Sequence, residues 1–398
     1  MTESAGRPSL GIGMVGYAFM GAAHAQAWRN AARVFDLPLQ PKMVALCGRD
    51  LAAVKAAADR QGWASAETDW RALIAREDVQ IVDVCTPGDL HAEISIAALE
   101  AGKHVLCEKP LANTVAEAEA MAAAAELAAD HGVRSMTGFN YRRVPAIALA
   151  RKLVADGRLG AIRHVRASYL QDWLTDPSFP LTWRLQRDRA GSGALGDLGA
   201  HVVDLAQCLT GEPITAVSGS TTTFVAERPL PGAAAERGDR TGTVTVDDAA
   251  MFTARLGSGP AGGATVGTFE VTRFAAGRKN ALRIELNGEL GSLAFDLERL
   301  NELDFHDHGT DPLTAGFRRI LVTEPGHPYV SAWWPPGHVL GWDVTFTHEV
   351  ADLVTAIAAD TAPQPSFAAG LQVQRVLAAV QQSAASASAW ISVPSPGH

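Results

Sequence analysis

Short apolar runs alternate with alanine-rich stretches of helical periodicity in the first part of the chain. The apolar runs predict buried β-strands, and the stretches between them predict helices. The predicted strands are 10–16, 42–48, 79–87, 103–107 and 133–141, and the predicted helices are 22–35, 51–62, 69–78, 91–102 and 114–132. Strands that alternate with helices of this length are typical of βαβ units. We therefore expect an α/β domain with a parallel, doubly wound sheet over residues 1–142.

The pattern changes after about residue 142, where strands follow one another with turn residues between them. The predicted strands are 161–173, 216–227, 247–257, 264–275, 280–297 and 300–307. Asn287-Gly288 between alternating apolar arms is a strong hairpin signal. Two stretches, 231–240 and 257–264, are predicted loops, and 343–386 returns to helix. We expect 143–398 to form an α+β domain with a large, mostly antiparallel open sheet.

Composition narrows the class of protein. The chain has 398 residues, of which 47% are hydrophobic and 19% charged, so it can bury a sizeable core. Its net charge of −9 argues against a nucleic-acid partner or an anionic membrane partner, because both favour a basic face. The N-terminus does not resemble a signal peptide, and no apolar run is long enough to suggest a membrane span. The four cysteines form no CxxC pair, so we predict reduced thiols and a cytoplasmic protein.

Two glycine motifs overlap near the start of the chain. The first, GIGMVG at 11–16, lies inside the predicted strand, where it cannot bind a phosphate. The second, GYAFMG at 16–21, follows the strand and opens the helix, which is the context in which a Rossmann domain binds a dinucleotide pyrophosphate. The alternative is a tight turn without a ligand. The predicted cofactor turn consists of Gly16, Ala18, Phe19, Met20 and Gly21, in which the methyl group of Ala18 departs from the motif.

The end of the second predicted strand bears on the choice of cofactor. NAD enzymes commonly carry an acid there for the ribose hydroxyls, whereas an arginine can bind the 2′-phosphate of NADP. Gly48 occupies the usual acid position and Arg49 follows it, which favours NADP. NAD remains an alternative cofactor, because Asp50 could be the acid that binds the ribose hydroxyls. Its side chain can instead cap the next helix.

Polar residues follow two further predicted strands. Ligands of an open α/β sheet bind at the carboxyl ends of its strands. Thr86 and Pro87 end the strand predicted over 79–87, and His91 lies just beyond it. Glu108 and Lys109 follow the strand predicted over 103–107. We predict that these five residues face the cofactor, with Lys109 next to the reacting carbon, where a lysine can handle a proton. A surface Glu–Lys pair after a strand is the alternative.

A second candidate cluster lies in GDLGAHVVD at 196–204. The apolar positions from Asp197 onward have helical spacing, and Asp197 and His201 stand four residues apart on one predicted helix face. A carboxylate and an imidazole so placed can share a proton or orient a substrate hydroxyl. The alternatives are a helix-start aspartate, a core histidine, or a metal site with Asp204. No further ligand pattern supports a metal, and we expect none.

Several stretches together resemble one known family. They are the strand-turn-helix segment 10–24, TPGDLH at 86–91, EAGKHVLCEKPLA at 100–112, GDLGAHVVD at 196–204 and GLQVQRVLAAVQQSA at 370–384. Over nearly its whole length the chain is similar to the glucose-fructose oxidoreductase / inositol dehydrogenase (Gfo/Idh/MocA) family. The resemblance implies a pyridine-nucleotide oxidoreductase in which Lys109 is the catalytic lysine. It also implies that Asp197 and His201 are the acid and the histidine of the substrate site.

The expected reaction moves a hydride between the nicotinamide and a secondary alcohol of a sugar, inositol or related polyol. The hydroxyl proton would go to Lys109 or His201. The resemblance also implies a homodimer or homotetramer formed through the open face of the second sheet. Two alternatives are a glycosidase that uses tightly bound NAD and a non-catalytic cofactor-binding regulator. Further residues expected to line the substrate pocket are Tyr141, Arg142, Trp173, Trp183 and Arg184.

Overall fold

The computed structural model describes residues 7–231, 240–257 and 265–394, and its chain forms two compact units. Unit 1 consists of Met1–Ala112, Ala116–Arg143 and Gly341–Leu371. Unit 2 consists of Asn113–Val115, Val144–Leu340 and Gln372–His398. The sequence assigned all of 143–398 to one domain, but the segment 341–371 clusters with unit 1 instead. Most of the two predicted loops, 232–239 and 258–264, lies outside the described residues.

Unit 1 contains a six-stranded sheet in the order β3-β2-β1-β4-β5-β6. Every pair of neighbours in it is parallel. The strands are β1 (Ser9–Val15), β2 (Gln40–Cys47), β3 (Ser65–Glu67), β4 (Ile81–Val84), β5 (His104–Glu108) and β6 (Ser135–Gly138). This order is that of the doubly wound dinucleotide-binding fold, so the predicted fold class is confirmed. The short strand β3 was not predicted.

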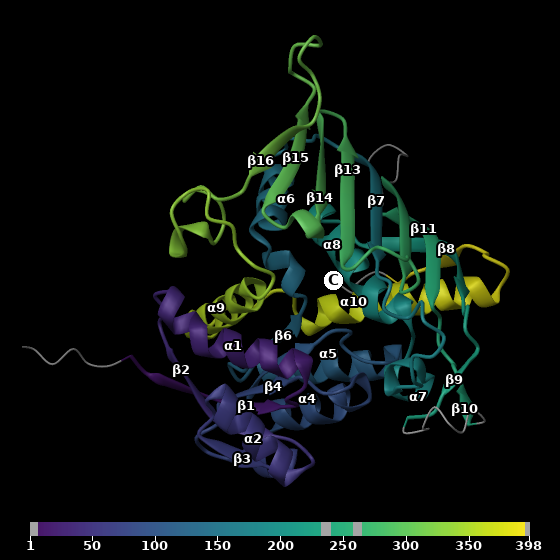
Figure 1. Ribbon diagram of the computed structural model, residues 1–398. Helices are drawn as coiled ribbons and strands as arrows, with labels where there is room; N and C mark the ends of the chain where they lie inside the picture. The colour runs from purple at the N-terminus through teal and green to yellow at the C-terminus, as the bar shows by residue number, and fades with distance from the viewer. Residues whose placement is uncertain (1–6, 232–239, 258–264, 395–398) are drawn as a thin grey trace, which may run out of the picture. The chain divides into compact units, whose positions relative to one another are not determined.

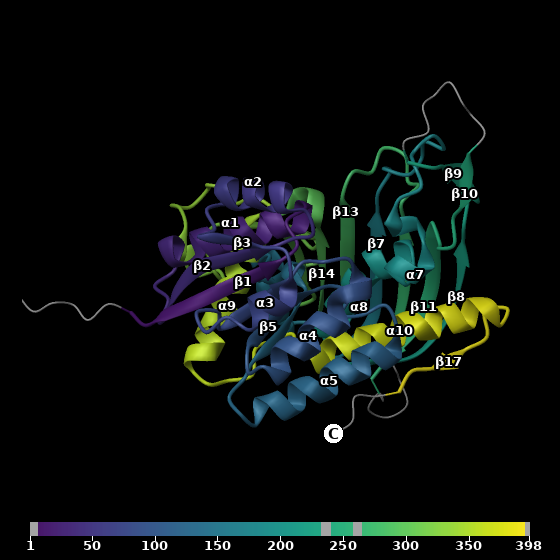
Figure 2. The same ribbon diagram turned by 90° about the horizontal axis from the view of Figure 1, so that it is seen from below.

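Helices cover both faces of this sheet (Figure 2). They are α1 (Phe19–Val34), α2 (Leu51–Gln61), α3 (Trp70–Ile74), α4 (His91–Glu100), α5 (Val115–Ala129) and α9 (Val344–Ala358). Helices α1 and α2 lie on one side of the sheet, and α4 and α5 lie on the other. The alanine-rich helices let the backbone approach the apolar strands closely, and Trp28 of α1 fills the largest fully buried position of the core.

Helix α9 explains why the segment 341–371 joins unit 1. It lies beside α1 in Figure 1, and its apolar face, with Phe346, Val350 and Leu353, belongs to the same buried cluster as Trp28. A buried hydrogen bond from Arg143 to Glu349 ties α9 to the end of the parallel-sheet segment. The helical period of α9 was visible in the sequence, but the sheet that it covers was not.

Unit 2 contains a nine-stranded sheet in the order β16-β15-β14-β13-β7-β12-β11-β8-β17. Within the described residues, β7 and β12 pair in parallel and the other neighbouring strands of this sheet are antiparallel. The strands are β7 (Ile162–Leu170), β8 (Ile214–Thr222), β11 (Ala249–Leu256), β12 (Thr265–Thr272), β13 (Ala281–Gly288), β14 (Gly291–Asp296), β15 (Glu302–Asp307), β16 (Arg318–Leu321) and β17 (Ile391–Ser392). The predicted mostly antiparallel sheet is confirmed. Strands β13 and β14 form the predicted hairpin, but its turn is at residues 289–290 and not at Asn287-Gly288, because Asn287 pairs with Ser292 within the ladder.

The two faces of this sheet differ in burial. Buried and exposed residues alternate along β11 from Ala250 onward and along β12 as far as Val271, as expected for a sheet with one covered face. The covering helices include α6 (Pro145–Ala155) and α8 (Ala200–Thr210). Helix α6, which begins with a proline in its first turn, was not predicted. The remaining elements are the hairpin β9 (Glu227–Pro229) and β10 (Thr241–Thr243), α7 (Arg187–Ala190) and α10 (Phe367–Ala385).

Candidate active site

The turn after β1 has room only for glycine at two positions. Gly16 has a φ of +104°, and a Cβ atom there would lie 2.5 Å from the carbonyl oxygen of Cys85. A Cβ atom on Gly21 would lie 2.2 Å from the carbonyl oxygen of Gly16. Gly11 instead packs inside the strand, where a Cβ atom would lie 1.8 Å from the Asp78 carbonyl oxygen. The structure therefore separates the two overlapping motifs as the sequence predicted.

The helix after this turn begins without a side-chain cap. Its N-cap residue is Ala18, and no acidic residue lies in the first turn of α1. The first N–H groups and the helix dipole therefore favour an anion at this end. The hydroxyl group of Thr86, at the end of neighbouring β4, is buried without a partner in the described part of the chain. These features fit the phosphates and ribose of a dinucleotide.

Residues Gly48 and Asp50 at the end of β2 have structural roles. A Cβ atom on Gly48 would lie 2.0 Å from the ring of Tyr17, so this position accepts an acid only if Tyr17 moves. Asp50 caps α2, because its Oδ1 accepts a hydrogen bond from the Ala53 N–H at 2.8 Å. The capping role that the sequence offered for Asp50 is confirmed. Arg49 between them is exposed.

The candidate catalytic lysine follows β5, whose last residue is the buried Glu108. One oxygen of Glu108 accepts a hydrogen bond from the Lys109 N–H at 3.1 Å, and the other lies 2.9 Å from Nε2 of His24. The peptide bond between Lys109 and Pro110 is cis. His91, at the start of α4, is buried and makes hydrogen bonds with the carbonyl oxygens of Pro110 and Thr86. The two predicted strand ends thus lie beside each other in unit 1.

Asp197 lies in unit 2 on a helical turn of unusual pitch. Residues Leu195–Gly199 form a π-helical turn directly before α8. The sequence predicted one continuous α-helix, and this part of the prediction was wrong. Asp247 shapes the segment before the turn, because its carboxylate accepts hydrogen bonds from the N–H groups of Gly193 and Leu195. Such π-turns are frequent at functional sites, since they redirect side chains within a helix.

The Asp197 carboxylate forms an ion pair with Arg273, at 3.0 Å. Arg273 is almost fully buried, whereas Asp197 is one-third exposed, at 33%. The same guanidinium group donates to the Gly193 carbonyl oxygen and lies over the ring of Trp173 at 5.3 Å. Asp197 is therefore held as a partly exposed carboxylate by a fixed cation, and Trp173 lies beside the same cation.

His201 is buried on α8, and its ring packs edge-on against Tyr169 with the ring centroids 5.8 Å apart. The Tyr169 hydroxyl group donates to Asn280 at 2.6 Å. Gln171 donates to the same Asn280 oxygen and accepts from the Trp173 indole N–H. A chain of polar contacts therefore connects the neighbour of His201 with Trp173.

The remaining predicted pocket residues divide between the units. Tyr141 is buried in unit 1, and its hydroxyl oxygen accepts a hydrogen bond from the Trp342 indole N–H at 3.2 Å. Arg142 follows it in a short 3₁₀ helix. In unit 2 the Arg184 guanidinium group lies over the Trp183 ring at 4.5 Å. Because Lys109 belongs to unit 1 and both Asp197 and His201 belong to unit 2, a shared site stays a prediction.

Comparisons with known proteins match both parts of the chain. Residues 10–139 match the family described as "Oxidoreductase family, NAD-binding Rossmann fold", and residues 147–294 match "GFO/IDH/MocA C-terminal domain". The levoglucosan dehydrogenase of Pseudarthrobacter phenanthrenivorans is 42% identical over 97% of this chain and 98% of its own. The chain belongs to the Gfo/Idh/MocA oxidoreductase family.

Two solved structures agree with this chain over nearly its full length. An oxidoreductase domain protein from Kribbella flavida is 66% identical, with a TM-score of 0.93 over 98% of this chain and 100% of its own. A levoglucosan dehydrogenase in complex with NADH and levoglucosan is 40% identical, with a TM-score of 0.90 over 97% of this chain and 99% of its own. The predicted activity, hydride transfer between a nicotinamide and an alcohol of a sugar or polyol, is confirmed at this level. The preference for NADP finds no support, since the solved complexes contain NADH.

Three polar residues of this Gfo/Idh/MocA protein were not predicted from its sequence. Asp83 is a charged residue within the apolar strand β4, which by itself should have signalled a buried partner. That partner is His24, whose position on α1 showed no pattern. Arg273 follows the half-buried strand β12, and nothing in the local pattern marked it as buried.

Within 7–231, 240–257 and 265–394 no helix combines the length and the apolarity that crossing a bilayer requires.

Proposed function

We propose that the protein is an NAD-dependent dehydrogenase of an anhydrosugar of the levoglucosan type. The observation that carries the proposal is the 42% identity with a levoglucosan dehydrogenase over 97% of this chain. Levoglucosan is a rigid bicyclic sugar without a free anomeric hydroxyl, so its oxidation must begin at a secondary alcohol. Trp173 and Trp183 supply aromatic faces, and Arg184 and Asp197 supply polar groups for such a substrate.

The proposed roles follow from the chemistry of each side chain. The bound nicotinamide supplies the hydride acceptor. Lys109 and His201 contact the reacting hydroxyl, and one of them takes its proton as the carbon is oxidised. Asp197 accepts a hydrogen bond from a substrate hydroxyl, and the Arg273 cation keeps this carboxylate in one orientation.

The direct test is a steady-state assay of NADH formation with levoglucosan, myo-inositol, glucose and xylose as substrates. We expect levoglucosan to give a kcat/KM at least about 10-fold above the others, because a fixed pocket that hydrogen-bonds one ring discriminates against misplaced hydroxyls by 1.4 kcal/mol or more. A higher kcat/KM with inositol or xylose would contradict the substrate. Net accumulation of NADH would also exclude the glycosidase mechanism, which regenerates its cofactor.

We further propose NAD(H) as the cofactor, which revises the interpretation of Arg49. Wild type should bind NADH more tightly than NADPH in fluorescence titrations. Arg49→Ala should leave NADH affinity nearly unchanged and weaken residual NADPH binding by about 10-fold, since an exposed guanidinium contributes about 1.5 kcal/mol to a phosphate. Exposed Arg60 of α2, changed to alanine, is the matched control. A wild-type preference for NADPH would contradict the assignment.

Oligomerisation and location remain predictions. The open face of the nine-stranded sheet carries a hollow of about 790 Å³, lined by residues of β7, β8 and β11 to β15 among others, which supports assembly of a homodimer or homotetramer through this face.

None of the four cysteines, all within the described residues, forms a disulfide, which is compatible with the predicted cytoplasmic location.

A further inference from the structure

Lys109 lies between two residues that are each held by a buried histidine. His24 of α1 lies 2.9 Å from a carboxylate oxygen of Glu108, the residue before the lysine. His91 of α4 lies 3.0 Å from the carbonyl oxygen of Pro110, the residue after it. Both imidazole side chains are inaccessible, with 1% of His24 and 2% of His91 exposed. Neither contact is explained by the chemistry assigned to the site above.

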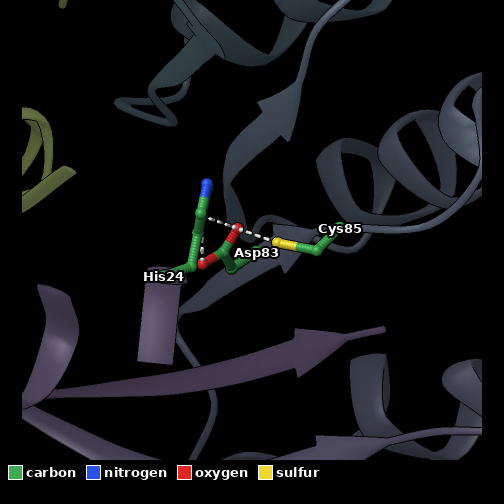
Figure 3. A group of neighbouring side chains, drawn as sticks. All are labelled: His24, Asp83 and Cys85. Carbon is green, nitrogen blue, oxygen red and sulfur yellow. Dashed lines mark hydrogen bonds and ion pairs between the residues drawn. The ribbon is translucent and has the colours of Figure 1, made fainter. Parts of the chain in front are cut away.

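His24 bridges two carboxylates. Its Nδ1 lies 3.0 Å from each oxygen of Asp83, and its Nε2 faces Glu108 (Figure 3 draws the Asp83 side). Asp83 also accepts hydrogen bonds from the Trp28 indole N–H at 2.6 Å and from the Cys85 thiol. A neutral imidazole has one N–H group and one lone pair, so it can donate to only one of two carboxylates. Donation to both requires the imidazolium ion.

The same cluster contains residue types that bind metals. His24, Asp83 and Cys85 lie close enough together to ligate one ion. The second ring nitrogen of His24 is, however, engaged by Glu108, and the nitrogen–oxygen distances of 2.9–3.0 Å are direct hydrogen bonds. The geometry therefore favours a charged hydrogen-bond network over a metal site.

His91 bridges two backbone carbonyls. Its Nδ1 lies 3.0 Å from the Pro110 oxygen, and its Nε2 lies 3.0 Å from the Thr86 oxygen. Carbonyl oxygens only accept hydrogen bonds, so this ring too satisfies both partners only as an imidazolium ion. Thr86 follows β4 and Pro110 follows β5, so the ring ties the ends of two adjacent parallel strands together.

We propose that His24 and His91 are positioning residues for Lys109, which act as two buried imidazolium ions that fix Glu108 and Pro110 on either side of it. The Glu108 carboxylate in turn holds the backbone of Lys109, because its second oxygen accepts a hydrogen bond from the Lys109 N–H. The inference rests on the proposed catalytic role of Lys109 and adds the means by which the fold holds that lysine in place. Pre-organisation of this kind matters, since misplacing a reacting group by about 1 Å can cost ~10²-fold in rate.

The electrostatic surroundings agree with two charged rings. Burial by itself lowers the pKa of His91. Cys107 and the two carbonyl acceptors have a larger combined effect in the other direction, so the pKa of His91 rises to about 9. Burial likewise lowers the pKa of His24, but Asp83 and Cys85 outweigh it and raise the value well above 6.5. Glu108 and Glu349 are the other acids near His24, and burial raises the pKa of Glu349 to about 8.

The kinetic test compares His24→Gln and His91→Gln with wild type, in the full-length protein with NAD+ and levoglucosan. We expect kcat to fall by about 10- to 100-fold in both variants, and the dissociation constant of NADH to change by less than about 3-fold in His24→Gln. His348→Gln is the matched control, because His348 is an equally buried histidine of unit 1 that contacts the Arg143 carbonyl oxygen and the ring of Phe35. Its kcat should stay within about 2-fold of wild type.

A double-mutant comparison separates positioning from a general loss of structure. In a Lys109→Ala background, His24→Gln should lower the remaining rate by less than about 2-fold, because residues that act through one group are not additive. Full additivity would overturn the proposal. If His24→Gln does not fold, Asp83→Asn weakens the same bridge, and an unchanged kcat in that variant would also overturn it. If Lys109→Ala itself keeps normal turnover, the proposed function fails instead.

Stability against pH provides a second measurement. A histidine whose folded pKa exceeds its unfolded value of about 6.5 stabilises the protein fully below pH 6.5 and loses that contribution as pH rises through the folded value. The stability difference between wild type and His91→Gln should therefore shrink between pH 6.5 and about 9. Because Glu349 is present in both proteins, its titration cancels. A difference independent of pH would show that His91 is neutral and would contradict the proposal.

Discussion

Replacing Lys109 by alanine is expected to lower kcat by about 10²- to 10⁴-fold, the range for loss of a general acid or base. The variant would lack the amine that accepts the proton of the substrate hydroxyl during oxidation. Cofactor affinity should survive, because the turn Gly16–Gly21 and the uncapped start of α1 are untouched. The measurements are steady-state turnover of NAD+ and fluorescence titration of NADH.

Two further variants make the Lys109 result specific. Lys109→Arg keeps the positive charge but cannot release a proton near neutral pH, so it should be nearly as inactive as the alanine variant. Lys55→Ala removes an exposed lysine of α2 and should leave kcat unchanged. Near-normal turnover in Lys109→Ala would exclude the mechanism, and near-normal turnover in Lys109→Arg would reduce the role of the lysine to its charge.

His201→Ala is expected to lower kcat by about 10²-fold, and the loss should not add to that of Lys109→Ala. If the two side chains serve one hydroxyl, removing the second costs little once the first is gone. The double variant should therefore resemble Lys109→Ala in kcat. Asp197→Asn belongs to the same test, since it keeps the shape of the side chain but loses the ion pair with Arg273.

The outcome that would contradict this arrangement is a simple sum of the two losses in log kcat. In that case His201 would be a core histidine that packs against Tyr169, and its replacement would act through stability. Thermal unfolding of His201→Ala distinguishes the cases, because a packing role predicts a lower Tm together with additive kinetics.

The sequence by itself determined the elements and the local turns of this protein. Apolar runs that alternate with stretches of helical period predicted the parallel sheet of the first part of the chain. Strands that follow one another without helices predicted the mostly antiparallel sheet of the second part. The two positions at Gly16 and Gly21 could be predicted because a Rossmann turn demands glycine whatever lies elsewhere in the chain. The strand-end residues Glu108 and Lys109 could be found for the same reason, since the carboxyl end of a strand is a local property of the sequence.

Tertiary structure alone decided which distant residues meet. His24 meets Asp83 across 59 positions and Glu108 across 84, and Arg143 meets Glu349 across 206. Local periodicity reports whether a residue is buried but not what it is buried against, so neither the histidine network nor the placement of α9 was predictable. The π-turn at Leu195–Gly199 has the same cause, because the Asp247 carboxylate that holds its start comes from about 50 residues further along the chain.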